Sequence, residues 1–421
     1  MTTANQGGIA KQITPLLKGN NVRKIRECRI VDYKFLYTLI ILFIYIIGRE
    51  IPLMGVDFGY YTGLAVNTDN IFLQTISGDA NRCSVLALGI SPYMMAGIIV
   101  QVVVACKRAD AKTKVSPKLQ NRWKLGLTVV FAFFMAASRV KELVFRVDES
   151  QILVCQWVSV VEMIAGAMII LWLADRNKQY GIGGQSAFIF INIIDGLTTN
   201  IFQHRLSELG LPIFIGIVAM MCMVVMENSE KRIPVQRISI HNVYADKSYI
   251  AIKLNPIGVM PAMFSTAFFM IPQMGSKFLA GLFPENGTLQ YIAEQMVVTK
   301  KLGVVVYIVI LYALTVFFSI IFLSPRDMTE GLLKGGDCIP GLHAGAETKK
   351  YLSGSIIRLG VLSATVMSIC LGLPMLLQLL GILEGTLVML PSSIMMLTGI
   401  TCSLRDEIKS LRNLDEYKPF I

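Results

Sequence analysis

Ten apolar stretches separated by short polar segments are the feature that most constrains this chain. About 20 apolar residues in a helix span the core of a bilayer, and a helix satisfies its own backbone hydrogen bonds where water is absent. We therefore expect an all-α membrane protein with ten transmembrane helices, at 35–47, 85–104, 125–137, 152–174, 187–202, 212–226, 256–271, 302–323, 355–377 and 385–403. The first, third and sixth stretches are short and would borrow flanking residues or tilt.

Lysine and arginine crowd every second gap between these stretches. If the N-terminus is cytoplasmic, 28 of the 39 basic residues lie in cytoplasmic segments and nine lie in external ones. Cytoplasmic loops carry such an excess in membrane proteins, so the pattern predicts both termini inside. The net charge of +11 is then mostly a topology signal, and we predict no direct nucleic-acid substrate.

The sequence carries no pattern of an enzyme, a metal centre or a cofactor. The segment 181–184 is rich in glycine but lacks the Lys-Ser/Thr of a phosphate-binding loop. The eight cysteines include no CxxC pair, so we expect free thiols, and the three histidines are scattered. The first 30 residues are polar and basic, so the first stretch is the expected targeting signal. Energy would come from a partner or a gradient.

Carboxylates inside the apolar stretches are scarce. Only Glu162 and Asp195 lie within or near one, whereas ion-coupled transporters need a central polar cluster. This scarcity disfavours a secondary transporter for a small solute, although ten spans also suit that class. A membrane scaffold or insertase without a pore is a further alternative.

Three of the connecting segments are unusual. The first, 54–84, is too polar to span but contains Ile71, Phe72 and Leu73. It is either an external amphipathic turn or a re-entrant segment surrounded by protein or water. Segment 227–253 contains β-prone runs at 243–244 and 249–252 that favour a hairpin. Segment 324–352 contains a helical run at 328–334 before Gly335-Gly336. Both could be solvated connectors or docking sites for a soluble partner.

Motifs along the whole chain are similar to those of SecY, the pore-forming subunit of the bacterial preprotein translocase. The most specific are Ser324-Pro325-Arg326-Asp327-Met328, Ile339-Pro340-Gly341 and Thr348-Lys349-Lys350-Tyr351-Leu352. Further matches are Gly48 to Val56, Leu86 to Tyr93, Trp172 to Asp175, Arg232 to Gln236 and Lys253 to Ala262. Their shared order across ten stretches resembles the family more strongly than any one motif does.

The resemblance implies a channel of two inverted halves, 1–202 and 203–421. They would open sideways to lipid between spans two and three on one side and seven and eight on the other, with Gln101 and Thr266 at this lateral gate. A plug would lie at about 70–82, and the residues assigned to it are Asn70, Ile71, Phe72, Leu73, Ser77 and Gly78.

The resemblance also implies a ring of apolar side chains that closes the pore by excluding water and ions. The positions carried over by motif are Met94, Ile98, Ile189, Ile193, Phe268 and Leu390. The span-five pair depends on one deleted residue within 183–186; without the deletion it would be Phe190 and Ile194. We prefer Ile189 and Ile193 because that alignment also matches Ser186 and Gly196-Leu197.

The resemblance implies partners and a location. A SecA-like ATPase would dock on the two loops through Lys231, Arg232, Arg237, Arg326, Lys334, His343, Lys349 and Lys350, with a ribosome as an alternative. SecE-like and SecG-like small subunits, preproteins with signal sequences and lipid complete the set, in a bacterial plasma membrane.

Two departures from the family pattern point to an accessory SecY paralogue. His343 and Ala344 stand where the family usually has Arg-Pro, and Gly183-Gly184-Gln185-Ser186 differs from the family's Gly-Asn-Gly-Ile-Ser. The family's arginine matters for engaging the cytosolic partner, so this chain is expected to serve fewer clients with a dedicated ATPase. A housekeeping SecY is the alternative.

Overall fold

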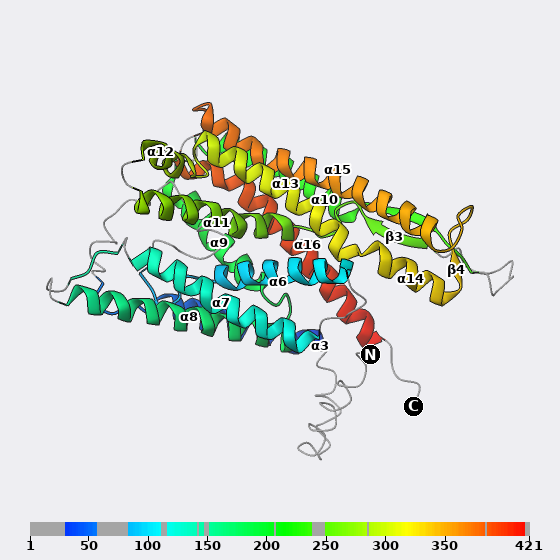
Figure 1. The fold of residues 1–421 in the computed structure, drawn as a ribbon, viewed down its shortest axis with the longest axis horizontal. Helices are drawn as coiled ribbons and strands as arrows, with labels where there is room; N and C mark the ends of the chain where they lie inside the picture. The colour runs from blue at the N-terminus through cyan, green and yellow to red at the C-terminus, as the bar shows by residue number, and fades with distance from the viewer. Residues whose placement is uncertain are drawn as a thin grey trace, which may run out of the picture.

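The computed structural model describes residues 30–56, 83–110, 116–140, 143–146, 151–205, 208–237, 249–283, 286–383 and 385–416. Within these ranges the chain is mostly helical, and a helix overlaps each of the ten predicted stretches (Figure 1). Those helices are α3 (Ile30–Arg49), α6 (Ser91–Asp110), α7 (Pro117–Val140), α8 (Ile152–Tyr180), α9 (Ser186–Gln203), α10 (Gly210–Asn228), α11 (Met260–Leu282), α13 (Lys301–Leu323), α15 (Ala346–Leu379) and α16 (Met389–Glu416).

The remaining elements are short. Two helices, α12 (Gly287–Gln295) and α14 (Pro325–Gly335), flank α13, and a 3₁₀ turn at Gly385–Val388 precedes α16. Four strands complete the described chain: β1 (Glu230–Pro234), β2 (Gln236–Arg237), β3 (Tyr249–Lys253) and β4 (Asp337–Cys338). The predicted helical run at 328–334 falls within α14.

Six of the described helices are long and apolar enough to cross a membrane: α3, α7, α8, α10, α13 together with α14, and α15. Residues Ser91–Val104 and Ser186–Phe202 form shorter apolar helices. Many large apolar side chains on these helices are exposed, such as Phe43 and Phe214 at 63% and 65%. Exposed apolar surface of this extent marks contact with lipid, so the chain is a multi-pass membrane protein.

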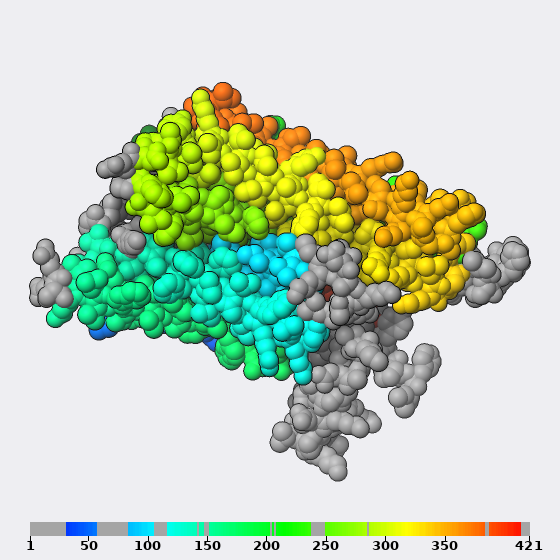
Figure 2. Space-filling view, in the orientation of Figure 1, coloured from blue at the N-terminus to red at the C-terminus, as the bar shows by residue number. Residues whose placement is uncertain are grey.

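The long helices form two groups. Helices α3, α6, α7, α8 and α9 pack among themselves, as do α10, α11, α13, α15 and α16. The groups meet where α6 packs against α11, and where α16 packs against α3 and α9. Figure 2 shows one side of this boundary, where the first group lies directly against the second.

Close backbone approach holds the first group together. A β-carbon at Gly166 in α8 would lie 2.1 Å from the carbonyl oxygen of Val85, in the turn before α6. That turn is tied to the end of α3, because Val85 N–H donates to the carbonyl of Ile51 at 3.0 Å. Small residues at such contacts are typical of packed membrane helices.

The predicted β-prone run at 249–252 is a strand, and its partner is 230–234; the other predicted run, 243–244, lies outside the described residues. Strands β1 and β3 pair antiparallel, with Glu230 opposite Lys253 and Pro234 opposite Tyr249. Strand β2 pairs with β4, so segment 227–253 is joined to segment 324–352 by a second small sheet. The two loops therefore form one structure at one end of α15 (Figure 1).

Candidate functional site

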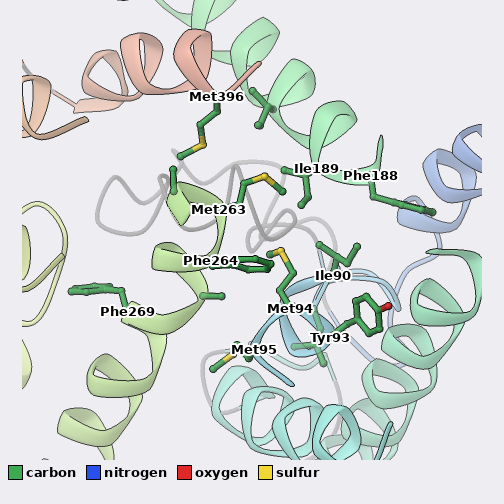
Figure 3. Packing of buried hydrophobic residues seen from close by; sticks show 14 of the residues in the cluster. Ile90, Tyr93, Met94, Met95, Phe188, Ile189, Met263, Phe264, Phe269 and Met396 are labelled. Atoms are coloured by element: carbon green, nitrogen blue, oxygen red, sulfur yellow. The ribbon is translucent and has the colours of Figure 1, made fainter. Parts of the chain in front are cut away.

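The interior between the two groups of helices is an apolar cluster drawn from four helices. Figure 3 shows Met94 from α6, Ile189 from α9, Met263 and Phe264 from α11 and Met396 from α16 pointing toward one another, and we call these five residues the central cluster. All five are buried in one hydrophobic core. None carries a charge, so the cluster can exclude water and ions but offers no group for acid–base or nucleophilic chemistry.

Four of the six predicted ring residues share this core. Met94, Ile98, Ile189 and Ile193 are each exposed by 1% or less. Phe268 is half-buried and packs against the same core. Leu390 is buried in a smaller cluster with Leu209 and Leu387.

The structure also bears on the span-five alternatives. Ile189 and Ile193 are fully buried, whereas Ile194 is 38% exposed. Phe190 is half-buried and packs at the edge of the core. The choice of Ile189 and Ile193 for the pore stays a prediction.

Sequence reasoning did not select Met263, Phe264 or Met396. Phe264 lies one helical turn before Phe268, so an i, i+4 relationship could have pointed to it. The high methionine content was a further signal, because methionine fills irregular interiors with a flexible side chain.

The two predicted gate residues lie on helices that touch. Gln101 is on α6 and Thr266 is on α11, and these helices pack against each other. Thr266 is buried and donates to the carbonyl of Met263 at 2.7 Å. The side-chain oxygen of Gln101 is buried and accepts no hydrogen bond within the described residues.

A polar contact connects α6, α7 and α8. The Nζ of Lys124 in α7 lies 3.5 Å from the ring centroid of Tyr93 in α6. The Tyr93 hydroxyl donates to Oδ1 of Asp175 in α8 at 3.0 Å. A cation over an aromatic ring is attracted by its π-electrons, so this contact holds α6 against α7 and α8.

The predicted plug lies outside the described residues. Every residue assigned to it falls within 57–82: Asn70, Ile71, Phe72, Leu73, Ser77 and Gly78.

The joined loops have a small hydrophobic core of their own. We call strands β1 to β4, α14 and residues 336–345 the loop unit. Buried Ile233, Ile252 and Ile339 pack with Leu352 and Ile356 of α15. This core fixes the loop unit on the first turns of α15, so its surface residues have defined positions.

The predicted docking residues lie on or beside the loop unit. The exposed ones are Lys231, Arg232, Arg326, Lys334, His343, Lys349 and Lys350; the side chain of Arg237 is not described. Arg232 pairs with Glu230 at 2.7 Å, and Arg326 pairs with Glu330 at 3.2 Å. The hydrogen bond that Arg232 donates to Glu230, followed by the charges of Tyr249 and Glu230, raises the pKa of Arg232.

His343, one of the two departures from the family pattern, lies in the turn that leads into α15. Its backbone N–H donates to Oε2 of Glu347 at 3.1 Å, and its carbonyl accepts from Oγ1 of Thr348 at 2.9 Å. The imidazole is exposed. The backbone of His343 thus orders the start of α15, while its side chain is available at the surface.

An ion pair connects the loop unit to the end of α16. The ammonium of Lys253 binds the carboxylate of Asp406, and its Nζ lies 3.8 Å from Oε2 of Glu227. The hydrogen bond from Lys253 lowers the pKa of Asp406. Burial alone would lower the pKa of Lys253, but the hydrogen bond and charge of Asp406, with the charge of Glu227, outweigh burial and raise it.

The described residues contain no group of three or more His, Cys, Asp or Glu side chains that could hold a metal ion. Six cysteines within them are free thiols, as predicted: Cys83, Cys155, Cys222, Cys338, Cys370 and Cys402.

The chain has relatives over nearly its whole length. It is 29% identical over 423 residues to the accessory Sec system protein translocase subunit SecY2 of Leuconostoc gelidum subsp. gasicomitatum, covering 95% of this chain and 99% of the relative. It is 28% identical to the protein of the same description from Streptococcus sanguinis, covering 93% and 98%.

Solved structures share the fold. One described as the structure of a protein conducting channel superposes with a TM-score of 0.64 at 17% identity, covering 93% of this chain and 95% of that one. Sec61 in the canine ribosome-channel complex from the endoplasmic reticulum gives a TM-score of 0.59 at 16% identity, with the same coverage.

A family comparison gives the assignment. The SecY family model matches residues 84–399, which is well over half of the chain and includes the central cluster and the loop unit. The chain therefore belongs to the SecY family of protein-conducting channel subunits, and it is not an enzyme.

Proposed function

We propose that this chain is the channel subunit of an accessory Sec system in a bacterial plasma membrane. It passes unfolded polypeptides across the membrane, and it releases apolar segments sideways into lipid. The observation that carries this proposal is the central cluster, in which uncharged side chains from α6, α9, α11 and α16 converge (Figure 3). Such a closure blocks water and ions, and its flexible methionines can yield around a chain of any sequence.

We further propose that ten helices cross the membrane with both termini in the cytoplasm, in halves 1–202 and 203–421. Support comes from the helix found at each apolar stretch and from the two packed groups. The excess of basic residues in alternate gaps gives the orientation. In this arrangement the loop unit faces the cytoplasm, and the α6–α11 contact is the lateral gate.

The accessory assignment is supported by the relatives described above, which are themselves named as accessory subunits. His343-Ala344, in place of the usual Arg-Pro, is consistent with a dedicated cytosolic partner. A housekeeping role is the competing assignment, and it would require binding to the general ATPase.

The chain performs no chemistry, so a partner must supply the driving force. A SecA-like ATPase is proposed to dock on the loop unit through its exposed basic residues. SecE-like and SecG-like membrane subunits are proposed to hold the two halves together. An apolar signal sequence would enter lipid between α6 and α11 because burial of its apolar surface is favourable.

The first test is photocrosslinking in membranes. A photoreactive residue replaces Ile98, and a stalled secretory precursor is supplied with the cognate ATPase. A crosslink to the mature part of the precursor is expected, because that part would lie in the pore. No crosslink with bound and active ATPase would reject a polypeptide-conducting role for this core.

A further inference from the structure

A polar contact at the C-terminal end of α3 joins this helix to α9. The Tyr45 hydroxyl donates to Oδ1 of Asn192 at 2.9 Å, and Arg49 Nη1 reaches the same oxygen at 3.4 Å. Arg49 Nη2 pairs with Oδ2 of Asp195 at 2.9 Å. Tyr45 also packs edge-on against Phe188, with ring centroids 5.1 Å apart.

The α9 partners of this contact share one face of the helix. Phe188, Asn192 and Asp195 are spaced four and three residues apart, so they lie above one another on the side that meets α3. Ile189 and Ile193 are each one residue further on, which turns them about 100° around the helix axis. In Figure 3, Phe188 points away from the central cluster, whereas Ile189 points into it.

Stability alone gives a weak reason for this polar group. Arg49 and Asn192 are 6% and 4% exposed, and charged or polar side chains are costly within a membrane. The Asn192 side-chain nitrogen is buried and has no hydrogen-bond partner within the described residues. A buried network that is only partly satisfied is less stabilising than apolar packing, and such networks can instead specify one arrangement.

We propose that Tyr45 and Arg49 are positioning residues that fix the rotation of α9, so that Ile189 and Ile193 form its contribution to the pore seal. The contact has a directional requirement, because the hydroxyl and guanidinium of α3 meet their acceptors on only one face of α9. Rotation by one residue position would break these bonds and bring Phe190 and Ile194 toward the pore. This inference rests on the proposed function, since it concerns which side chains meet the translocating polypeptide.

The test uses three photoreactive positions, 98, 189 and 190, in the unaltered chain and in Asn192→Leu. Leucine is close in size to asparagine but removes the oxygen that both Tyr45 and Arg49 use. In the unaltered chain, position 189 should crosslink the stalled precursor strongly and position 190 weakly. In Asn192→Leu, crosslinking should fall at 189 and rise at 190, and the resting ion conductance should rise several-fold.

Thr38→Val is the matched control. Thr38 also joins α3 to the rest of the first group, through Oδ1 of Asn177 at 2.9 Å and the backbone N–H of Ile182 at 2.8 Å. These two hydrogen bonds go to α8 and to the turn before α9, and not to Asn192 or Asp195. Loss of the Thr38 hydroxyl should lower the thermal stability of the protein without changing the ratio of crosslinks at 189 and 190.

Two outcomes would overturn the inference. One is an unchanged 189-to-190 ratio in Asn192→Leu, and the other is an equal change in Thr38→Val. If Asn192→Leu does not fold, Tyr45→Phe removes a single hydroxyl and should shift the ratio in the same direction. Position 98 distinguishes failure of the positioning role from failure of the channel function. If the precursor crosslinks at 98 but crosslinking at 189 does not change in Asn192→Leu, the positioning role is rejected and the channel function is retained.

Discussion

Asp406 and Glu407, consecutive residues near the end of α16, bind opposite parts of the molecule. Asp406 pairs with Lys253 of the loop unit, which belongs to the second group of helices. Glu407 Oε2 accepts a hydrogen bond at 3.0 Å from the backbone N–H of Gly183, in the turn between α8 and α9 of the first group. One turn of α16, a helix of the second group, therefore contacts both the loop unit and the first group of helices.

Asp406→Asn should lower the stability of the protein by about 0.2–1 kcal/mol, the range for partly exposed ion pairs. The pKa of Asp406 is lowered in the folded state. Its contribution is therefore present above the unfolded pKa of about 4 and is lost as the pH falls through the folded pKa. The pKa of Lys253 is raised, so its contribution is present below about pH 10.4 and is lost as the pH rises through the folded value.

Thermal unfolding in detergent as a function of pH measures this difference. The difference in unfolding temperature between the original chain and Asp406→Asn should be constant near neutral pH and should become smaller in acid. Glu330→Gln serves as the control, because Glu330 forms an exposed i, i+4 pair with Arg326 and should have little effect. A gap that widens in acid would contradict the assignment.

Phe264→Asn should cause a larger resting ion leak than Phe268→Asn. Phe264 is 3% exposed and faces Met94 in the central cluster (Figure 3), whereas Phe268 is half-buried at its edge. A polar side chain in an apolar constriction promotes wetting, and the effect should be greatest where the side chain meets others. Single-channel conductance in planar bilayers gives the order, and a larger leak from Phe268→Asn would restore the motif-based ring position.

Gly166→Ala should destabilise the first group of helices by about 1–3 kcal/mol, the usual cost of overpacking. The added β-carbon would lie 2.1 Å from a backbone oxygen of Val85, which cannot move aside as a side chain could. Gly126→Ala in α7 is the matched control, because a β-carbon there meets nothing within 4 Å. Equal unfolding temperatures for the two variants would show that α8 does not approach Val85 this closely.

Charge reversal beside the loop unit, at the start of α15, should weaken partner binding without harming the fold. Lys349→Glu with Lys350→Glu changes two exposed side chains in the first turns of α15. Affinity for the ATPase should fall by at least tenfold at low salt and by less at high salt, because exposed charges are screened. Lys301→Glu, at the start of α13, is the control, and an equal loss of affinity there would argue against the loop unit as the docking site.

Sequence periodicity identified the helices because crossing a membrane demands long apolar runs, which are visible without any tertiary contact. The predicted start of the second span, at residue 85, is six residues before the start of α6, because 85–90 is apolar but forms a turn. That turn is held by pairing with residues distant in sequence, including a bridge between Pro52 and Ser84. Similarly, β3 was predicted from its β-prone run, but its pairing with β1 was not, and the β2–β4 pairing depends on a contact between separate loops.

The site was predicted less completely than the fold. Met94, Ile98, Ile189 and Ile193 could be selected only through the family resemblance, because each resembles an ordinary packing residue when taken singly. Met263, Phe264 and Met396 reach the same interior from α11 and α16 (Figure 3). Which face of a helix points inward depends on its neighbours when all faces are apolar, so periodicity cannot choose among them.

The pairing of β2 with β4 has a mechanical consequence. It ties the segment after α10 to the segment after α14 by backbone hydrogen bonds, and the buried isoleucines beneath make the joint stiff. Force applied to the loop unit would be shared between α10, α13 and α15. A motor that pushes on the loop unit would therefore tilt these three helices together and would not bend a single loop.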